Sequence, residues 1–374
     1  MSTPAVEKDA PQRIIAIDAL RGFDMFWITG GKPLFLPFTA ILFLKFPGLQ
    51  SALDHQFHHV PWGDRLVFWD LIMPLFLFIV GASMPFSFAR RQEEGHPKGA
   101  LYRKMLRRVA ILWILGMIEQ GNLLHLDLGK LILFSNTLQA IAAGYLIGGI
   151  IMLNTGIRGQ AIAIATLLLF YWALLALVPF GGHPGGTMES QVNLARYFES
   201  FLFGSFADNG NYYTWALSSL GFAGTVLFGI LAGHVLRGNR DGWQKLRILL
   251  GAGVALIVLG EVWNLVHPIN KYIWTSSMTV WTAGWCFLML AGFYLLIDLW
   301  GYRKFAFPFI VLGANALVAY MAGFFIRFDD IAALIFRGEE SMGVSGVLLQ
   351  AFAAFMILWL ALYWMYKKRI FVRI

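Results

Sequence analysis

The sequence predicts an all-α protein, a polytopic bundle of membrane-spanning helices. Apolar residues make up 58% of the 374-residue chain and charged residues only 13%, a balance that a soluble domain of this length does not show. The apolar residues gather in stretches of about 20, the length at which a helix crosses roughly 30 Å of hydrocarbon. We therefore expect about ten, possibly eleven, transmembrane helices in a single domain over 1–374.

The expected spans follow one another along the chain with short polar segments between them. A polar tail, 1–13, precedes the first span, which carries three charged residues and no small-residue cleavage site and is therefore expected to be retained. The apolar segment 34–46 could add an eleventh, short or re-entrant helix. The ten spans are 14–31, 66–88, 105–122, 131–153, 160–179, 215–236, 247–266, 275–298, 305–326 and 345–366.

The basic residues predict the orientation of the bundle. If the polar tail is cytoplasmic, 20 of the 29 Lys and Arg residues fall in inner segments, as the positive-inside rule requires. Both termini are then cytoplasmic, and the net charge of +8 reflects topology rather than a nucleic-acid partner. The longest outer segments become 47–65 and 180–213, where binding sites are expected. The single Cys286 excludes an internal disulfide.

Ionisable residues lie directly before the second span. His58, His59 and Asp70 stand at the predicted membrane boundary, where such groups cost about 2.5–3.5 kcal/mol and usually serve a function. A histidine there can accept a proton from an amine or hydroxyl. Asp70 could orient it, or only cap a helix N-terminus. His55 and His59 could instead bind zinc, but without the Glu of an H-E-x-x-H pattern we predict no metal.

Further polar residues fall inside or between the spans. Asp18, Arg21 and Asp24, spaced by three, are expected to form a salt-bridged set on one side of the first helix. An outer cluster between the seventh and eighth spans is a plausible sugar-binding wall, although Trp also gathers at membrane interfaces for physical reasons alone. That cluster comprises Asn264, His267, Asn270, Lys271, Trp274, Thr275 and Ser276. Polar residues expected to join helices are Glu119, Asn136, Gln139, Glu261 and Asn315.

Four sequence blocks resemble the transmembrane acyltransferase family that includes heparan-alpha-glucosaminide N-acetyltransferase and its bacterial relatives. They are RIIAIDALRGFDMF at 13–26, HHVPWGDRLVFWDLIMPLFLFIVGASMPFS at 58–87, NKYIWTSSMTVWTAG at 270–284 and LGANALVAYM at 312–321. The chain departs from the family's pattern at three places. Where the family has an acidic block before its middle helix, this chain reads YYTWALSSLGFAG. The family's Gln-Arg-Ile corresponds to Gln139, Ala140 and Ile141, and the Asn that the family has near its catalytic His corresponds to Thr29.

The resemblance implies an enzyme that transfers an acetyl group from cytoplasmic acetyl-CoA to a glucosamine-type amino sugar at the outer face. His59, three residues before Trp62, takes the family's catalytic position, with Asp70 and Thr29 beside it. Basic groups that could meet the phosphates of the donor are Arg21, Arg103 and Arg107, although an inner loop is basic for topological reasons alone. Candidate acceptor-binding residues are His58, Trp62, Asn264, Asn270, Lys271 and Trp274.

Two other functions fit the composition. A sugar or oligosaccharide permease would also have ten helices with polar groups inside the membrane, but the chain shows no two-half repeat of the kind that many transporters have. An acyltransferase that O-acylates envelope glycans is the other. The short loops favour a multi-pass protein of the bacterial inner membrane. We expect a small-molecule sugar, acetyl-CoA and membrane lipid as partners, possibly a homodimer, and no nucleic acid.

Overall fold

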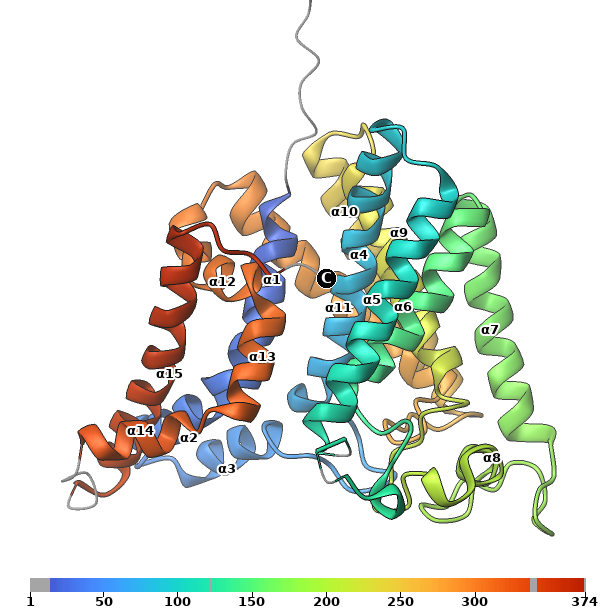
Figure 1. The fold of residues 1–374 in the computed structure, drawn as a ribbon, viewed down its shortest axis with the longest axis horizontal. Coiled ribbons are helices and arrows are strands. Elements are labelled where there is room, and N and C mark those ends of the chain that lie inside the picture. The colour runs from blue at the N-terminus through green and yellow to red at the C-terminus, as the bar shows by residue number, and fades with distance from the viewer. Residues whose placement is uncertain (1–13, 122, 125, 337–341, 373–374) are drawn as a thin grey trace, which may run out of the picture.

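The protein is a bundle of long helices in the computed structural model, which describes residues 14–121, 123–124, 126–336 and 342–372 (Figure 1). The predicted tail 1–13 lies outside the described residues. Within them, eight helices are long and apolar enough to cross a membrane, or nine if a bent pair counts as one span. The prediction of a polytopic helical membrane protein is confirmed.

The helices lie in the following order. The helices of 12 residues or more are α1 (Ile15–Phe26), α4 (Ile72–Glu93), α5 (Lys98–Glu119), α6 (Thr137–Asn154), α7 (Ile157–Leu177), α9 (Ser219–Arg237), α10 (Gly242–Asn264), α11 (Ser276–Phe293), α12 (Arg303–Ala314) and α15 (Val344–Lys367). The shorter ones are α2 (Lys32–Leu42), α3 (Pro47–Gln56), α8 (Leu194–Phe203), α13 (Ala316–Phe325) and α14 (Phe328–Ile335). Two π-helical segments, η1 (Trp27–Gly31) and η5 (Tyr294–Leu299), extend α1 and α11.

Three expected spans differ in detail from the structure. The segment 34–46 does form a short helix, α2, but it adds no eleventh span, because η1 joins α1 to α2 as one helical span, Ile15–Leu42. The ninth expected span is broken at Asn315, where α12 and α13 meet at a bend of 64°. The expected span 105–122 falls in α5, a helix of 22 residues. α5 is absent from the eight because four basic residues crowd its first half: Arg103, Lys104, Arg107 and Arg108.

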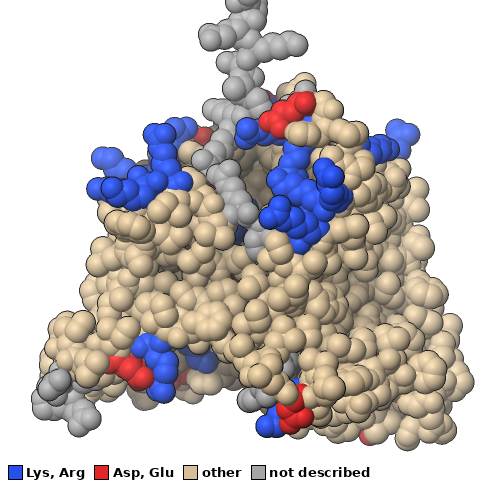
Figure 2. All heavy atoms as spheres, viewed as in Figure 1, with Lys and Arg blue, Asp and Glu red and all other residues tan. Residues whose placement is uncertain are grey.

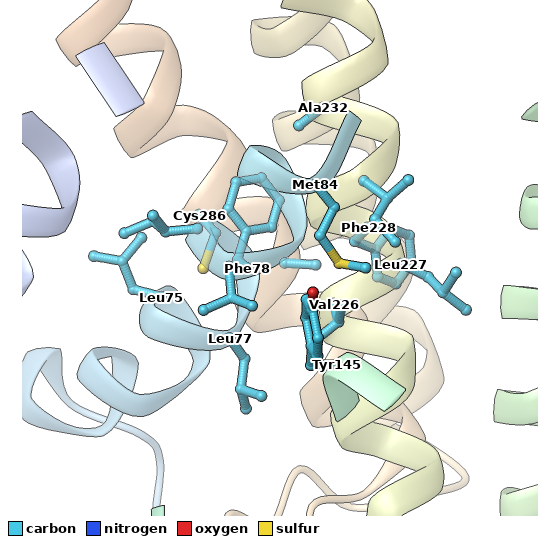
Figure 3. Packing of buried hydrophobic residues seen from close by; sticks show 14 of the residues in the cluster. Leu75, Leu77, Phe78, Met84, Tyr145, Val226, Leu227, Phe228, Ala232 and Cys286 are labelled. Carbon is cyan, nitrogen blue, oxygen red and sulfur yellow. The ribbon is translucent and has the colours of Figure 1, made fainter. Parts of the chain in front are cut away.

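Glycines allow the central helices to approach closely. A Cβ on Gly229 of α9 would lie 2.0 Å from the carbonyl oxygen of Phe78, and one on Gly81 of α4 would lie 2.0 Å from that of Val226. Small residues permit such backbone contact between membrane helices, where van der Waals packing replaces the hydrophobic drive. The core of the bundle therefore centres on α4 and α9, whose buried side chains meet Cys286 of α11 and Tyr145 of α6 (Figure 3).

Buried polar residues join helices, as predicted. The carboxylate of Glu119 accepts hydrogen bonds from Asn136 Nδ2 at 2.9 Å and from the Tyr320 hydroxyl at 2.9 Å, which links α5, α6 and α13. The amide of Asn315 holds the chain after α15, since it donates to the carbonyl of Ile370 and accepts from the N–H of Val372. At the break between α12 and α13, this side chain ties the bend to the C-terminal segment.

The two ends of the bundle differ in charge. Figure 2 shows Lys and Arg side chains gathered at the end where α1 begins, which we call the basic end. In Figure 1 this end also holds the connections that follow α4, α9 and η5 and the chain after α15. The opposite end, which we call the site end, carries α2, α3, α8 and α14 (Figure 1). The two long segments expected to be outer loops, 47–65 and 180–213, thus contain helices α3 and α8.

Candidate functional site

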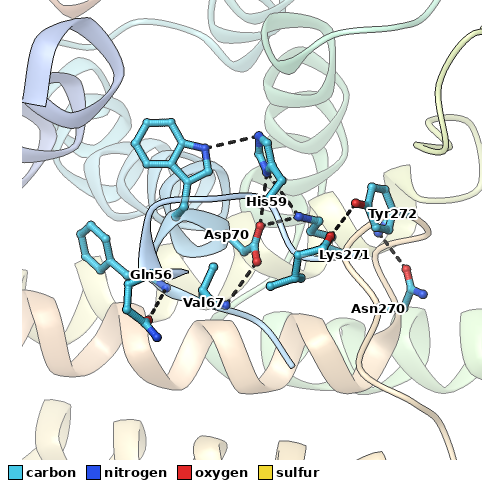
Figure 4. Close-up of polar contacts among 10 residues, drawn as sticks. Gln56, His59, Val67, Asp70, Asn270, Lys271 and Tyr272 are labelled. Atoms are coloured by element: carbon cyan, nitrogen blue, oxygen red, sulfur yellow. Dashed lines mark hydrogen bonds and ion pairs between the residues drawn. The ribbon is translucent and has the colours of Figure 1, made fainter. Parts of the chain in front are cut away.

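Three ionisable side chains meet at the site end: those of His59, Asp70 and Lys271 (Figure 4). Asp70 Oδ1 lies 2.6 Å from Lys271 Nζ and 3.4 Å from His59 Nδ1, and Lys271 Nζ lies 3.3 Å from His59 Nδ1. His59 comes from the segment after α3, and Lys271 from the connection between α10 and α11. The three therefore form one compact hydrogen-bonded cluster drawn from three parts of the chain.

The position of Asp70 follows from the turn that begins the second span. Asp70 lies in a 3-10 turn, η2 (Phe68–Leu71), directly before α4, and its Oδ2 accepts a hydrogen bond from the N–H of Val67 at 3.2 Å. The N–H of Phe68 donates to Gln56 Oε1 at 3.1 Å. The carboxylate of Asp70 is 0% exposed, so its hydrogen bonds must replace the water that it loses. Asp70 thus both caps the turn and faces the histidine, the two roles that the sequence left open.

The hydrogen bonds of His59 define its tautomer. Trp69 Nε1, which can only donate, lies 3.3 Å from His59 Nε2, so Nε2 carries the lone pair. The proton of a neutral imidazole is then on Nδ1 and donates to the carboxylate of Asp70, so the Lys271 ammonium near Nδ1 is an electrostatic neighbour and not a hydrogen-bond partner of the ring. The side chain of His59 is 62% exposed. The basic nitrogen is Nε2, which the Trp69 N–H covers in this structure, and a buried carboxylate orients the ring from the Nδ1 side.

Lys271 supplies a buried positive charge. Its side chain is 4% exposed, and its ammonium lies 4.9 Å from the centre of the Tyr272 ring, a cation–π contact. Burial lowers the pKa of Lys271, whereas the hydrogen bond and charge of Asp70 raise it. Because the carboxylate compensates the ammonium, a cation can stay beside the imidazole and offer N–H donors to a developing negative charge.

An aromatic wall adjoins the cluster. The rings of Trp62 and Tyr272 stack with centres 5.4 Å apart and planes 13° apart, and the ring of Tyr213 lies 4.8 Å from that of Tyr272. The Tyr272 hydroxyl donates to the carbonyl of Val60 at 2.7 Å, and Trp62 Nε1 donates to the carbonyl of Met188 at 3.1 Å. These contacts tie three connections at the site end into one surface. The pKa of the Tyr213 hydroxyl is raised by burial, with smaller contributions from Tyr272 and Asp70.

Several residues predicted to contact an acceptor hold the Lys271 connection instead. Asn270 Oδ1 accepts from the N–H of Tyr272 at 2.9 Å, and Asn264 Oδ1 accepts from that of Ile269 at 2.8 Å. Trp274 is 2% exposed and donates to Thr225 Oγ1. These groups fix the backbone that presents Lys271. Their predicted contact with an acceptor stays a prediction.

The remaining predicted site residues lie outside the cluster. The Thr29 hydroxyl donates to the carbonyl of Met25 in its own helix, and His58 Nδ1 lies 2.7 Å from the carbonyl oxygen of Asp54. Arg103 and Arg107 are exposed on α5 near the basic end. Among the described residues no hydrogen bond joins Thr29 to His59, and the roles of all four residues stay predictions.

The charged set on the first helix forms only in part. Arg21 pairs with Asp18 at 3.3 Å and donates to Ser83 Oγ at 2.7 Å, which links α1 to α4. Asp24 is completely buried, and its carboxyl has no hydrogen-bond partner among the described residues. The expected three-residue salt-bridged set is therefore wrong for Asp24.

Sequence reasoning missed three members of the site: Trp69, Tyr213 and Tyr272. Trp69 and Tyr272 each adjoin a predicted residue, Asp70 and Lys271, and lie inside blocks that carried the resemblance, so proximity to those blocks was an available signal. Tyr213 had none. As for metals, no three His, Cys, Asp or Glu side chains of the described residues come together in a way that could hold an ion.

Fold and site together define a polytopic helical membrane protein with a histidine–carboxylate–ammonium cluster at one end of its bundle. No family model matches the chain. The chain is 22% identical to mouse heparan-alpha-glucosaminide N-acetyltransferase over 99% of its length and 22% identical to the human protein of that name over 97%. It spans 62% and 60% of these relatives. The chain is thus a distant relative of heparan-alpha-glucosaminide N-acetyltransferase.

Proposed function

We propose that the protein is a transmembrane acetyltransferase that moves an acetyl group from acetyl-CoA to a glucosamine-type amino sugar. The observation that carries this proposal is the contact of His59 with Asp70 and Lys271 at the site end, since it combines a base, its orienting carboxylate and a cation. The distant relationship to an N-acetyltransferase supports the same reaction class. Transporter substrate sites lie near the bilayer midplane, whereas this cluster lies at one end of the bundle.

The proposed chemistry uses the lone pair of His59 Nε2, which the Trp69 N–H must release when the acceptor binds. The neutral amine of the acceptor attacks the thioester carbonyl, a C–N bond forms, and Nε2 takes the proton that the nitrogen loses. The C–S bond then breaks, and the imidazolium returns its proton to the leaving thiolate of CoA. Asp70 stabilises the imidazolium from the Nδ1 side, as a buried carboxylate does in other histidine-based sites.

Lys271 supplies the hydrogen-bond donor for the oxyanion in this proposal. The tetrahedral intermediate carries its negative charge on the former carbonyl oxygen, and the ammonium beside the imidazole is a suitable donor for that charge. A second route uses the same lone pair as a nucleophile, so that Nε2 holds the acetyl group before the acceptor arrives. Both routes require His59 unprotonated on Nε2.

The donor enters from the basic end in this proposal. The positive-inside rule makes the end rich in Lys and Arg cytoplasmic, which puts both termini inside and the cluster at the outer face. Arg103 and Arg107, at the start of α5, are candidates to meet the phosphates of CoA. Arg21, which lies on α1 and donates to Ser83 of α4, is further into the bundle. The short connections favour the inner membrane of a bacterium.

The test measures acetyl transfer and donor binding separately. Purified protein in detergent should bind acetyl-CoA by calorimetry and release CoA when glucosamine is added. His59→Ala should lower turnover by about 10²-fold or more and leave acetyl-CoA binding unchanged. His55→Ala, an exposed histidine of α3, is the matched control. Undiminished turnover in His59→Ala would refute the catalytic role, and a wild-type protein that binds no acyl-CoA would refute the proposed function.

A further inference from the structure

A groove of about 950 Å³ opens at the site end between α2, α3, α14 and α15, the short helices at the lower left of Figure 1 and the start of α15. This volume is at the upper end of the range for small-molecule sites. Its lining includes Leu36, Pro37, Ala40, Gln50, Asp54, His58, Ala333, Val344, Val347 and Gln350.

The walls of the groove differ in chemistry. Ala40 on α2 and Val347 on α15 belong to two of the helices that are apolar enough to cross a membrane. Gln50 and Asp54, four residues apart on α3, contribute an amide and a carboxylate to another wall. A ligand that satisfies both walls has an apolar chain and a head group with several hydrogen-bonding groups.

The groove reaches the residue next to the candidate active site. His58 lines the groove, whereas the next residue, His59, contacts Asp70 and Lys271. Adjacent Cα atoms are about 3.8 Å apart, so a head group bound at His58 lies one residue along the chain from the proposed base. His58 turns Nδ1 to the carbonyl of Asp54, which leaves Nε2 for a hydroxyl of the ligand.

We propose that this groove binds the apolar chain of the acceptor, so that the acceptor is an amino sugar linked to a lipid rather than a free sugar. The inference rests on the proposed acetyl transfer and names its substrate class. The chain would lie between α2 and α15, and the sugar would sit at the polar wall with its amine toward His59. A lipid-linked substrate is also concentrated in the plane of the membrane, which raises its concentration at the groove.

The experiment compares methyl and hexyl glucosaminide, both below micelle-forming concentration. Each is tested as an acceptor in the acetyl-transfer assay and, without acetyl-CoA, as a ligand in calorimetry. Each methylene that leaves water contributes about fourfold in affinity, so partial entry of the hexyl chain should raise kcat/KM at least tenfold over the methyl glycoside. In Ala40→Trp and Val347→Trp, which fill the groove, this ratio should fall toward one. Val254→Trp, at an exposed site on α10, should keep the wild-type ratio.

Equal kcat/KM for the two glycosides in the wild type, or an equal ratio in Ala40→Trp and Val254→Trp, would overturn the groove proposal. Binding separates this failure from failure of the proposed function. If neither glycoside is acetylated, tighter binding of the hexyl glycoside that is lost in Ala40→Trp still supports the groove. Equal binding of both glycosides overturns it.

Discussion

Replacing Asp70 by Asn tests the cluster most directly, because one carboxylate serves both partners. Asn keeps the size of the side chain and an oxygen for the N–H of Val67. It removes the negative charge that lies 2.6 Å from Lys271 Nζ and 3.4 Å from His59 Nδ1. The variant therefore leaves a buried ammonium uncompensated and the imidazole without its orienting charge.

The expected magnitude follows from the burial of the pair. Removing one partner of a buried ion pair typically costs about 3–5 kcal/mol, and the side chains of Asp70 and Lys271 are 0% and 4% exposed. Loss of the orienting carboxylate should also lower turnover by roughly 10²- to 10⁴-fold. Asp64→Asn, an exposed aspartate in the same connection, should change stability by no more than about 0.5 kcal/mol.

The pH dependence of Asp70→Asn has a defined sign. Asp70 raises the pKa of Lys271 and burial lowers it from 10.5, so without Asp70 that pKa falls further below its unfolded value. Between the folded and unfolded pKa values the unfolded chain binds more protons, and stability rises with pH. The free energy of unfolding of the variant should therefore move toward that of the wild type as the pH approaches 10.5.

Thermal unfolding in detergent, followed by tryptophan fluorescence, measures these effects. The double variant Asp70→Asn with Lys271→Met removes both charges and should be more stable than Asp70→Asn alone, because no unpaired charge remains. If Asp70→Asn unfolds at the wild-type temperature and the double variant is no more stable than the single one, the account of the cluster as a compensated buried pair is wrong.

Two further predictions concern packing and a second buried carboxyl. Gly229→Ala should lower the melting temperature by several degrees, because its Cβ would meet the carbonyl oxygen of Phe78 at 2.0 Å. Gly251→Ala is the control, since nothing lies within 4 Å of its Cβ, and it should be neutral or stabilise the protein by up to about 1 kcal/mol. Equal melting temperatures for the two variants would contradict the close crossing of α4 and α9. Burial raises the pKa of Glu199 on α8 to about 8, so the unfolded chain loses this proton first, and wild-type stability should fall between about pH 4.5 and 8. Glu199→Gln should flatten that decline in unfolding measured against pH, and an unchanged profile would exclude Glu199 as its source.

The spans could be predicted from the sequence because the length of an apolar stretch is a local property. About 20 apolar residues suffice to cross the hydrocarbon wherever the helix packs, so the bundle and most boundaries followed directly. The break at Asn315 could not be predicted in this way. Its 64° bend lies where hydrogen bonds join the Asn315 side chain to the distant segment 370–372. The continuity of α1 with α2 through η1 was also missed, since a π-helical segment has no clear sequence signature.

The candidate site was predictable only as separate parts. His59 and Asp70 are 11 residues apart and meet through a local turn, so their pairing could be inferred from the segment itself. Lys271 lies 201 residues from Asp70 in the sequence. The residue types around Lys271 suggested only that it was one member of a polar wall. Asn264, Asn270 and Trp274 have the residue types of a sugar site, yet in the structure they fix a backbone, because a side chain's role depends on which neighbours compete for its hydrogen bonds.

The sequence by itself determined the class of the protein, the rough limits of most of its long helices, and the position of its ionisable residues directly before the second span. Hydrophobic length and the distribution of charge decide these properties without reference to distant parts of the chain. Only the tertiary structure decided that Lys271 compensates Asp70, that Trp69 fixes the tautomer of His59, and that a groove with one apolar and one polar wall adjoins them. These features arise where helices far apart in sequence pack together, and packing geometry is a property of the whole bundle.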